Sequence, residues 1–264
     1  MPTKEPRYTA DNCKCSYQLN WTLTLFWKEP AIPEDDWIAQ LSEAVEKDGV
    51  RILEYREKEP LTSQFLLSTK SSVTPSKIVW SLKGRLQHEI RKQCPRAFKG
   101  NFSIKSVGDI KSADLEAYLD SQLTRHATAD AQALALLEQY QIDNASDDLD
   151  APRMSSHGEI MHNLHLVLVN DGRFSSVSDE GHASKHSIIT RTAEKKGHLL
   201  AKARILADHI HLMVGCGITE SPEEVALAYM NNIAYAHEMR PVLQFGFFAG
   251  TFSTYDIGAI RNAL

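Results

Sequence analysis

The sequence predicts an α+β protein made from two copies of one small unit. Segments with strand-like alternation of apolar residues are interleaved with segments of helical apolar spacing, the mixture that this class requires. The order of segments before a polar stretch near the middle recurs after it at nearly the same spacing. The length of 264 residues also suits two units, because domains of about 100–150 residues are the commonest size.

The first part of the chain alternates between these two patterns. Apolar, aromatic and β-branched residues in alternation predict strands, and apolar residues three or four apart predict helices. Asp35-Asp36 marks one helix start and Thr74-Pro75 marks another. In order, the segments are a strand at 17–28, a helix at 37–47, strands at 51–58 and 64–69, a helix at 76–92, a strand at 98–107, and helices at 113–126 and 130–140.

Residues 142–158 are rich in Asp, Asn and Ser and contain few apolar residues, so they are predicted to form a linker. The strand and helix patterns then resume. The resumed segments are a strand at 159–170, a loop at 175–186, a helix at 188–204, a strand at 209–214, a helix at 223–239 and a strand at 242–251. The predicted halves are therefore residues 1–141 and residues 159–264, the second truncated after its last strand.

Fixed spacings between marker residues test the repeat. Aligning Pro75 with Pro222, each at a helix start, places Thr62 against His209, since each lies 13 residues earlier. A glycine followed within two residues by a phenylalanine also comes at nearly the same distance after each proline. The two halves are thus interpreted as versions of one β-α-β-β-α-β-α unit, complete in the first half. This is the order of a ferredoxin-like or RRM-like antiparallel sheet with helices packed on one face.

One predicted strand carries a pair of histidines. In the segment Asp208–Val214, His209 and His211 are two residues apart and project from the same face of a strand. Two neighbouring imidazoles make half of a site for a divalent cation; the alternative is a pair of half-exposed histidines that bind nothing. The first half has Thr62 and Gln64 at the same positions. His162, His165, His182 and His186 are further possible ligands, although the first two are not expected to share a strand face.

The predicted helix at 113–126 combines polar and apolar faces. Tyr118, Gln122 and His126 are four residues apart and share one face; the alternative is an amphipathic helix with a tyrosine at its boundary. A tyrosine hydroxyl is a poor nucleophile at its usual pKa near 10, but a divalent cation can polarise a phosphate for its attack. Two histidines and the Gln122 amide oxygen would suffice as protein ligands. Tyr118 falls against Leu264 in the repeat, so no second copy of this helix is expected.

These motifs resemble those of the single-tyrosine HUH transposases, which include the REP-associated tyrosine transposases. The resemblance rests on His209-Ile210-His211, on Tyr118-x-x-x-Gln122 and on the Phe-rich segment 247–252. It implies the HUH nuclease fold. It also implies cleavage and rejoining of single-stranded DNA next to hairpins through a 5′-phosphotyrosine, with Mg²⁺ or Mn²⁺. Family members are homodimers in which the tyrosine helix of one subunit often serves the histidine pair of the other.

The division of motifs between the halves then predicts a tandem, single-chain pseudo-dimer that is monomeric. Tyr118 from the first half would join His209, His211 and Gln122 in one composite site, and the other site would lack its ligands. A single site suggests a specialised or domesticated nuclease. Tyr255 is the rival nucleophile because it follows the last predicted strand of the second half, but it has no Gln four residues later.

Contacts to DNA phosphates are expected from basic residues of both halves. The candidates are Lys83, Arg85, Lys185, Arg191, Lys195, Lys196, Lys202 and Arg204. The net charge of −5 counts mildly against DNA binding, so a catalytically inactive protein that binds hairpin or single-stranded DNA is an alternative, as is a small metallohydrolase unrelated to DNA. The absence of a long apolar run and the four scattered cysteines predict a cytoplasmic, nucleoid-associated protein without membrane contact.

Overall fold

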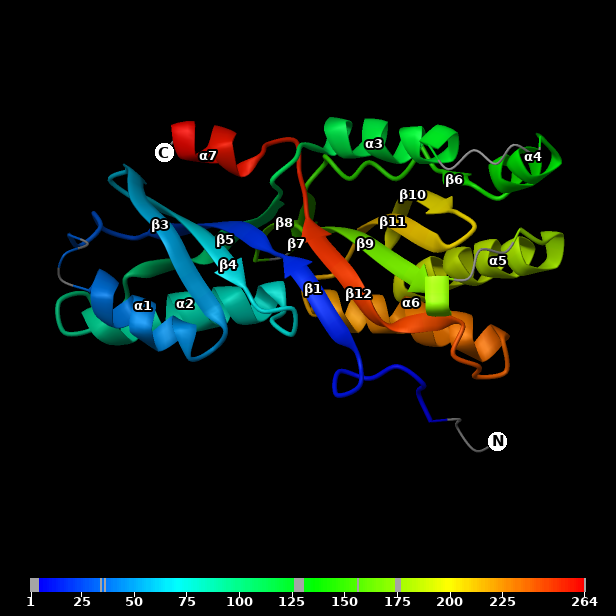
Figure 1. The fold of residues 1–264 in the computed structure, drawn as a ribbon. Coiled ribbons are helices and arrows are strands. Elements are labelled where there is room, and N and C mark those ends of the chain that lie inside the picture. Colours follow the sequence, from blue (N-terminus) through cyan, green and yellow to red (C-terminus); the bar gives the residue numbers. More distant parts are fainter. Residues whose placement is uncertain are drawn as a thin grey trace.

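Two six-stranded sheets lie side by side in the computed structural model, which describes residues 5–33, 35, 37–125, 131–155, 157–173 and 177–263. The first-half sheet has the strand order β3-β4-β2-β5-β8-β7, and the second-half sheet has the order β1-β12-β9-β11-β10-β6. Figure 1 shows the two sheets to the left and right of the molecule, each with a pair of helices below it. The predicted α+β class and the tandem arrangement of two ferredoxin-like units are confirmed.

The two halves contain the same seven elements in the same order. The first half comprises β2 (Asn20–Trp27), α1 (Ile38–Glu46), β3 (Val50–Glu59), β4 (Thr62–Thr69), α2 (Pro75–Ile90), β5 (Phe98–Val107) and α3 (Ser112–Arg125). The second half comprises β9 (Asn163–Asn170), α5 (Asp179–Lys196), β10 (Leu199–Ile205), β11 (His209–Gly215), α6 (Pro222–Ala236), β12 (Leu243–Thr251) and α7 (Ile257–Ala263). In each half, the four strands of the repeated unit pair antiparallel.

The second half differs from its prediction in three places. The predicted strand at 159–170 is two strands, β8 (Gly158–Met161) and β9, which pair in different sheets. Helix α5 begins at Asp179, inside the predicted loop, because the Ser178 side chain caps it by accepting from the Gly181 amide. It ends at Gly197, whose φ of 67° is the left-handed conformation that terminates helices. Residues 199–205 therefore form β10 rather than the end of a helix. Helix α7 also follows β12, so the second half continues beyond its last strand.

The predicted linker is not irregular throughout. It contributes β6 (Ile142–Asp143), β7 (Arg153–Ser155) and the start of β8 (Gly158–Met161), after the short helix α4 (Ala131–Gln139). Three residues named in the predictions, Asp36, His126 and Leu264, lie outside the described part of the chain. No described helix is long and apolar enough to cross a membrane.

An exchange of edge strands joins the halves. Strand β1 (Lys14–Gln18) leads into β2 but pairs in parallel with β12 of the second half. Strand β8 leads into β9 but pairs in parallel with β5 of the first half. The hydrogen bonds at the junction are mirrored too. The Asn20 amide donates to Thr251 Oγ1 (2.8 Å), and the Asn163 amide donates to Ser106 Oγ (3.1 Å). The halves are thus related by an approximate twofold axis, as in a symmetric dimer.

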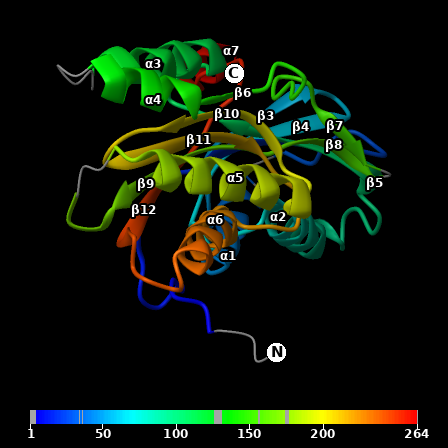
Figure 2. The same cartoon turned by 90° about the vertical axis from the view of Figure 1, so that its right-hand side faces the viewer.

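The helices after β5 and β12 cross over to the opposite half. Parallel bridges join Gly108 to Asp256 and Lys111 to Ser253 at the crossing. Figure 1 shows α3 above the second-half sheet and α7 above the first-half sheet, and Figure 2 shows the second-half sheet between α3 with α4 on one side and α5 with α6 on the other. Because Ser106 and Thr251 are equivalent, Tyr118 corresponds to Ala263, one residue before the predicted Leu264.

Apolar packing explains why each layer forms. Each half has its own core between its sheet and its lower helix pair. A smaller cluster lies above the second-half sheet, where Leu115 and Leu119 of α3 pack against Met213 and Phe252. The first half of the chain thus supplies a helix that buries apolar surface on the sheet of the second half, a contribution that stabilises the crossover.

Candidate composite active site

Strand β11 places the two predicted histidines on the face of the sheet that α3 covers. The strand lies inside the sheet, paired with β9 and β10. Alternation sends Ile210 and Leu212 into the second-half core. His209, His211 and Met213 project from the opposite face. His211 is only 3% exposed, whereas His209 is half-buried.

The two imidazoles converge on one point. Asp208 Oδ1 lies 2.7 Å from His209 Nδ1, and His165 Nε2 lies 3.0 Å from His211 Nδ1. If each Nδ1 carries the hydrogen of these bonds, both Nε2 atoms present lone pairs. Those Nε2 atoms are 3.0 Å apart, within hydrogen-bond distance of each other, and this is also about the separation of two nitrogens bound at right angles to one cation at about 2.1 Å. The arrangement suits a cation between them, with Asp208 and His165 orienting the rings.

Tyr118 reaches this point from the other half of the chain. Its ring stands edge-on to the His211 imidazole, with centroids 5.7 Å apart. The side chain is 39% exposed, so the phenol remains accessible to a substrate. Gln122, one turn later on α3, is buried and its amide nitrogen donates to the Tyr118 carbonyl (3.3 Å). This orientation directs the amide oxygen away from that carbonyl.

Sequence reasoning placed His209, His211, Tyr118 and Gln122 in one site, and the structure brings Tyr118 and His211 into ring contact. Within the described residues, no group of three or more His, Cys, Asp and Glu side chains is arranged to hold a metal ion. A third protein ligand would therefore come from another residue type, and the Gln122 amide oxygen fits that requirement chemically. The metal role of the histidines stays a prediction.

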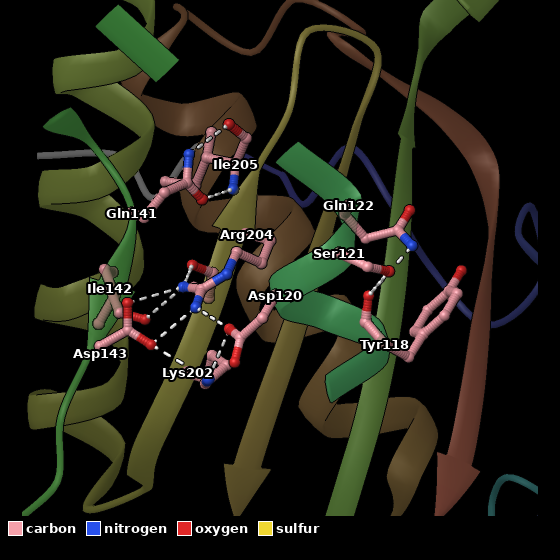
Figure 3. A network of polar contacts seen from close by, with 11 residues as sticks. Tyr118, Asp120, Ser121, Gln122, Gln141, Ile142, Asp143, Lys202, Arg204 and Ile205 are labelled. Atoms are coloured by element: carbon pink, nitrogen blue, oxygen red, sulfur yellow. Dashed lines mark hydrogen bonds and ion pairs between the residues drawn. The ribbon is translucent and has the colours of Figure 1, made fainter. Parts of the chain in front are cut away.

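Ion pairs dock α3 onto the second-half sheet. Asp120 accepts from Lys202 (2.7 Å) and Arg204 (2.5 Å), and Asp143 of β6 also pairs with Arg204 (2.8 Å). Burial opposes ionisation of Asp120, but the hydrogen bonds from the two cations outweigh it and lower its pKa. Figure 3 shows Asp120 turned toward Lys202 and Arg204, whereas Tyr118 and Gln122 lie on the other side of the helix. The network therefore fixes the rotation of α3 that presents Tyr118.

Helix α7 docks on the first-half sheet with the opposite polarity. The Arg261 guanidinium contacts Glu54 of β3 at 2.6 Å. Strand register makes Glu54 the equivalent of Lys202, since they pair with the equivalent residues Leu66 and Met213. The positively charged side chain of this ion pair is thus on the sheet in the second half and on the helix in the first half.

The predicted DNA-contacting residues occupy three kinds of environment. Lys202 and Arg204 hold α3 in place, and the Arg204 side chain is 5% exposed. Three others are engaged with protein groups: Lys83 with the carbonyls of Lys99 and Gly100, Arg85 with Asp48, and Lys185 with Asn170. Arg191, Lys195 and Lys196 are exposed on α5, the last near Glu220. We assign Lys202 and Arg204 to docking of α3.

Tyr255, the rival nucleophile, precedes α7 in the loop after β12. It is 61% exposed, and its amide donates to Ser253 Oγ. Because this loop leads into the helix above the first-half sheet, Tyr255 belongs to the crossing and not to the face of α3 that meets His211.

His165 was named from the sequence only as one of several further possible ligands, and Asp208 was not predicted as a site residue. His165 stacks on His211 with ring centroids 5.2 Å apart, and burial lowers its pKa to about 4. Its position follows from the pairing of β9 with β11, in which His165 lies opposite Met213. The sequence alone could not place His165 beside His211, because the pairing of β9 with β11 and the register of that pair had to be known first. Asp208 directly precedes the histidine pair and was recognisable as a carboxylate partner.

Comparisons with known proteins give likenesses at the level of structure. No family model and no curated protein matches the chain. A candidate transposase from Deinococcus radiodurans R1 is 19% identical over 42% of this chain and 95% of its own, with a TM-score of 0.33. A REP-associated tyrosine transposase bound to a REP hairpin is 10% identical over 39% of this chain and 61% of its own, with a TM-score of 0.32. A bacterial light-regulated adenylyl cyclase is 12% identical over 74% and 60%, with a TM-score of 0.21.

Proposed function

We propose that this protein cleaves and rejoins single-stranded DNA near hairpins through a covalent bond to Tyr118, in one composite active site. The observation that carries the proposal is the ring contact between Tyr118 and His211, which come from different halves of the chain. The motif resemblance to single-tyrosine HUH transposases supports the same chemistry. The protein is then a single-chain pseudo-dimer of transposase type, with Mg²⁺ or Mn²⁺ as cofactor.

The reaction follows from the groups present. The Tyr118 hydroxyl loses its proton and attacks a backbone phosphorus; a P–O bond to Tyr118 forms, and the P–O3′ bond breaks. The leaving 3′ oxygen takes up a proton, which conserves charge, and the 5′ end stays on the enzyme. Rejoining is the reverse, with a 3′ hydroxyl as nucleophile. A divalent cation held by His209, His211 and Gln122 would polarise the phosphate and lower the barrier to both steps.

Substitution of Tyr118 tests the proposal. We expect Tyr118→Phe to eliminate the covalent adduct between the protein and a labelled, hairpin-containing single strand in the presence of Mn²⁺, because phenylalanine has no nucleophilic oxygen. The matched control is Tyr255→Phe, which should form the adduct at the wild-type level. The adduct is measured as a labelled, denaturation-resistant band on a gel. Persistence of the adduct in Tyr118→Phe, or its loss in the Tyr255 variant, would contradict the assignment.

The second candidate function is hairpin or single-strand binding without cleavage. It is favoured by the first half, where Thr62 and Gln64 stand in place of His209 and His211, so that half keeps the fold without the histidine pair. The same gel distinguishes the two functions. Retarded DNA without a denaturation-resistant band, in the wild type and with each metal, is the result expected from a non-catalytic binder.

A further inference from the structure

Helix α2 presents an exposed row of residues on the outside of the first half. Lys77, Trp80, Gly84, His88 and Arg91 follow each other at spacings of three or four, so they share one face, with Arg91 at the C-terminal cap. All five are exposed, and the indole of Trp80 is 73% exposed. Among the aromatic residues that the structure describes, Trp80 is the most exposed.

The same region concentrates positive charge in an acidic protein. Residues 75–100 contain seven Lys and Arg side chains and a single acidic one, Glu89, although the chain as a whole has a net charge of −5. Two of the seven have internal roles, since Lys83 contacts backbone carbonyls and Arg85 pairs with Asp48. The exposed cations are Lys77, Arg91, Lys92, Arg96 and Lys99. A polyanion is the complementary partner.

Gly84 in the middle of this face has no packing explanation. A Cβ placed on it would meet no described atom within 4 Å, so an alanine fits, and glycine costs a helix interior about 1 kcal/mol relative to alanine. Gly84 lies one turn after Trp80. A long side chain at this position would lie beside the indole and cover part of it. The glycine therefore leaves the ring accessible.

The equivalent face of α6 in the second half is in contact with another segment of the same chain. Mirrored hydrogen bonds from Ser76 to Ile218 and from Glu223 to Ser71 establish that the two helices are equivalent. On α6, Asn231 stands in the place of Gly84. It binds the backbone of Tyr8 through two hydrogen bonds, of 2.9 and 2.7 Å. The bent N-terminal segment of the chain thus contacts α6 through Tyr8.

The charge of the two faces differs as well. Leu227 replaces Trp80 on α6 and is half-buried, and Glu224 replaces Lys77. The α2 face is exposed where the α6 face contacts the N-terminal segment, and it carries a charge that fits nucleic acid.

We propose that the α2 face binds single-stranded DNA, with Trp80 stacking on an unpaired base and Lys77 and Arg91 contacting the flanking phosphates. The proposal deepens the proposed function and rests on it for the choice of DNA as the polyanion. The face lies on the helical side of its sheet, opposite α7 (Figure 1). It holds the strand away from the cleavage site, and it binds without sequence preference because every base offers a stacking surface.

The experiment measures binding of the full-length protein to a fluorescent oligodeoxythymidine of about 16 nucleotides, long enough for one such groove, in EDTA so that no cleavage occurs. We expect Trp80→Ala to weaken binding about tenfold through loss of stacking and Trp80→Phe to retain most of it. Tyr235→Ala is the matched control, since Tyr235 is equally exposed on α6 at 64% and should bind as the wild type does. In Lys77→Glu, the slope of the logarithm of the binding constant against the logarithm of salt concentration should also fall in magnitude by about 0.7.

Two substitutions of Gly84 are expected to differ in their effect on DNA binding. Gly84→Ala should raise the melting temperature and keep DNA binding, because the helix gains propensity and the indole stays accessible. Gly84→Leu should also fold, but it should weaken binding about as much as Trp80→Ala. Circular dichroism melting checks that both variants are folded.

Several results would overturn the proposal. One is unchanged oligonucleotide binding in Trp80→Ala. Another is a wild-type dimer in sedimentation analysis that Trp80→Ala converts to monomers, since the face would then be a protein interface. Failure of the proposed function is distinct: it appears as the absence of a Tyr118 adduct while Trp80→Ala still weakens binding.

Discussion

The two halves of the chain share a backbone but differ at every position of the candidate site. Equivalent register positions carry His165, His209 and His211 in the second half and Thr22, Thr62 and Gln64 in the first. Both sets stand on the same strands and face of their sheets, and both halves have full ladders and closed cores. The comparison teaches that the histidines are not needed for the fold, which ladder hydrogen bonds and apolar burial maintain.

The first-half counterpart of the site is a polar cavity of about 340 Å³ lined by Thr22, Thr62, Gln64 and their neighbours. The Gln64 amide oxygen accepts from Arg56 (3.1 Å), and Glu159 accepts from Ser103 and pairs with Lys105. Hydroxyls, an amide and a closed ion pair replace the converging imidazoles. Thr62 and Gln64 offer oxygen rather than imidazole nitrogen ligands, so no histidine site for a cation remains there.

The largest expected effect comes from making the second half resemble the first. His211→Gln should weaken Mn²⁺ binding by more than about a hundredfold and remove the covalent DNA adduct. Loss of a residue that only orients a metal ligand already costs about 10- to 100-fold in affinity, and His211 is proposed to bind the cation directly. Binding is measured by titration calorimetry and the adduct on a denaturing gel. Mn²⁺ binding at wild-type strength in this variant would show that the histidine pair holds no cation.

The converse change sharpens the same comparison. Thr62→His with Gln64→His should add a second Mn²⁺ site to the first half. That site should be about 10- to 100-fold weaker than the first, since Leu61 stands in place of Asp208 and Thr22 in place of His165. A stoichiometry that stays at one would contradict the strand equivalence on which the comparison depends.

A smaller effect is expected from the docking ion pairs. Asp120→Asn should speed hydrogen exchange of the α3 amides about fivefold and reduce the adduct, because charged hydrogen bonds of a half-exposed carboxylate contribute about 1 kcal/mol. Glu54→Gln is the control in the other half: it should loosen α7 and leave the adduct unchanged. Exchange is read by mass spectrometry. Equal effects of the two substitutions on the adduct would refute a specific role of Asp120 in positioning Tyr118.

A pH effect on stability, outside the candidate site, is expected from His162, which stands where the first half has Leu19. Burial is the main cause that lowers its pKa to about 4. Between pH 6.5 and 4 the unfolded chain therefore binds a proton that the folded chain excludes, so the free energy of unfolding falls as pH falls through this range. His162→Leu should reduce the loss of stability between pH 7 and 5 by about 1–2 kcal/mol, measured by urea unfolding. An unchanged pH dependence would contradict this linkage.

Much of the fold followed from local pattern. The periodicity of residues 98–107 predicted β5 with its bounds, and the cap signals Thr74-Pro75 and Ser221-Pro222 predicted two helix starts. The pattern failed at residues 188–204, where basic residues on both α5 and β10 concealed the end of the helix at Gly197. Pairing of a strand with the other half cannot be inferred locally either, which is why β6, β7 and the first residue of β8 lay in a predicted linker.

The sequence by itself determined that the chain is a tandem repeat, that one strand holds His209 and His211, and that one helix presents Tyr118 and Gln122. These features depend on spacing along the chain, which the periods of strand and helix convert directly into faces. Only the tertiary structure decided that α3 crosses to the second-half sheet, that Asp120 fixes its rotation, and that His165 lies against His211. Those contacts join segments separated by tens of residues, and they depend on strand register, crossover and ion pairing.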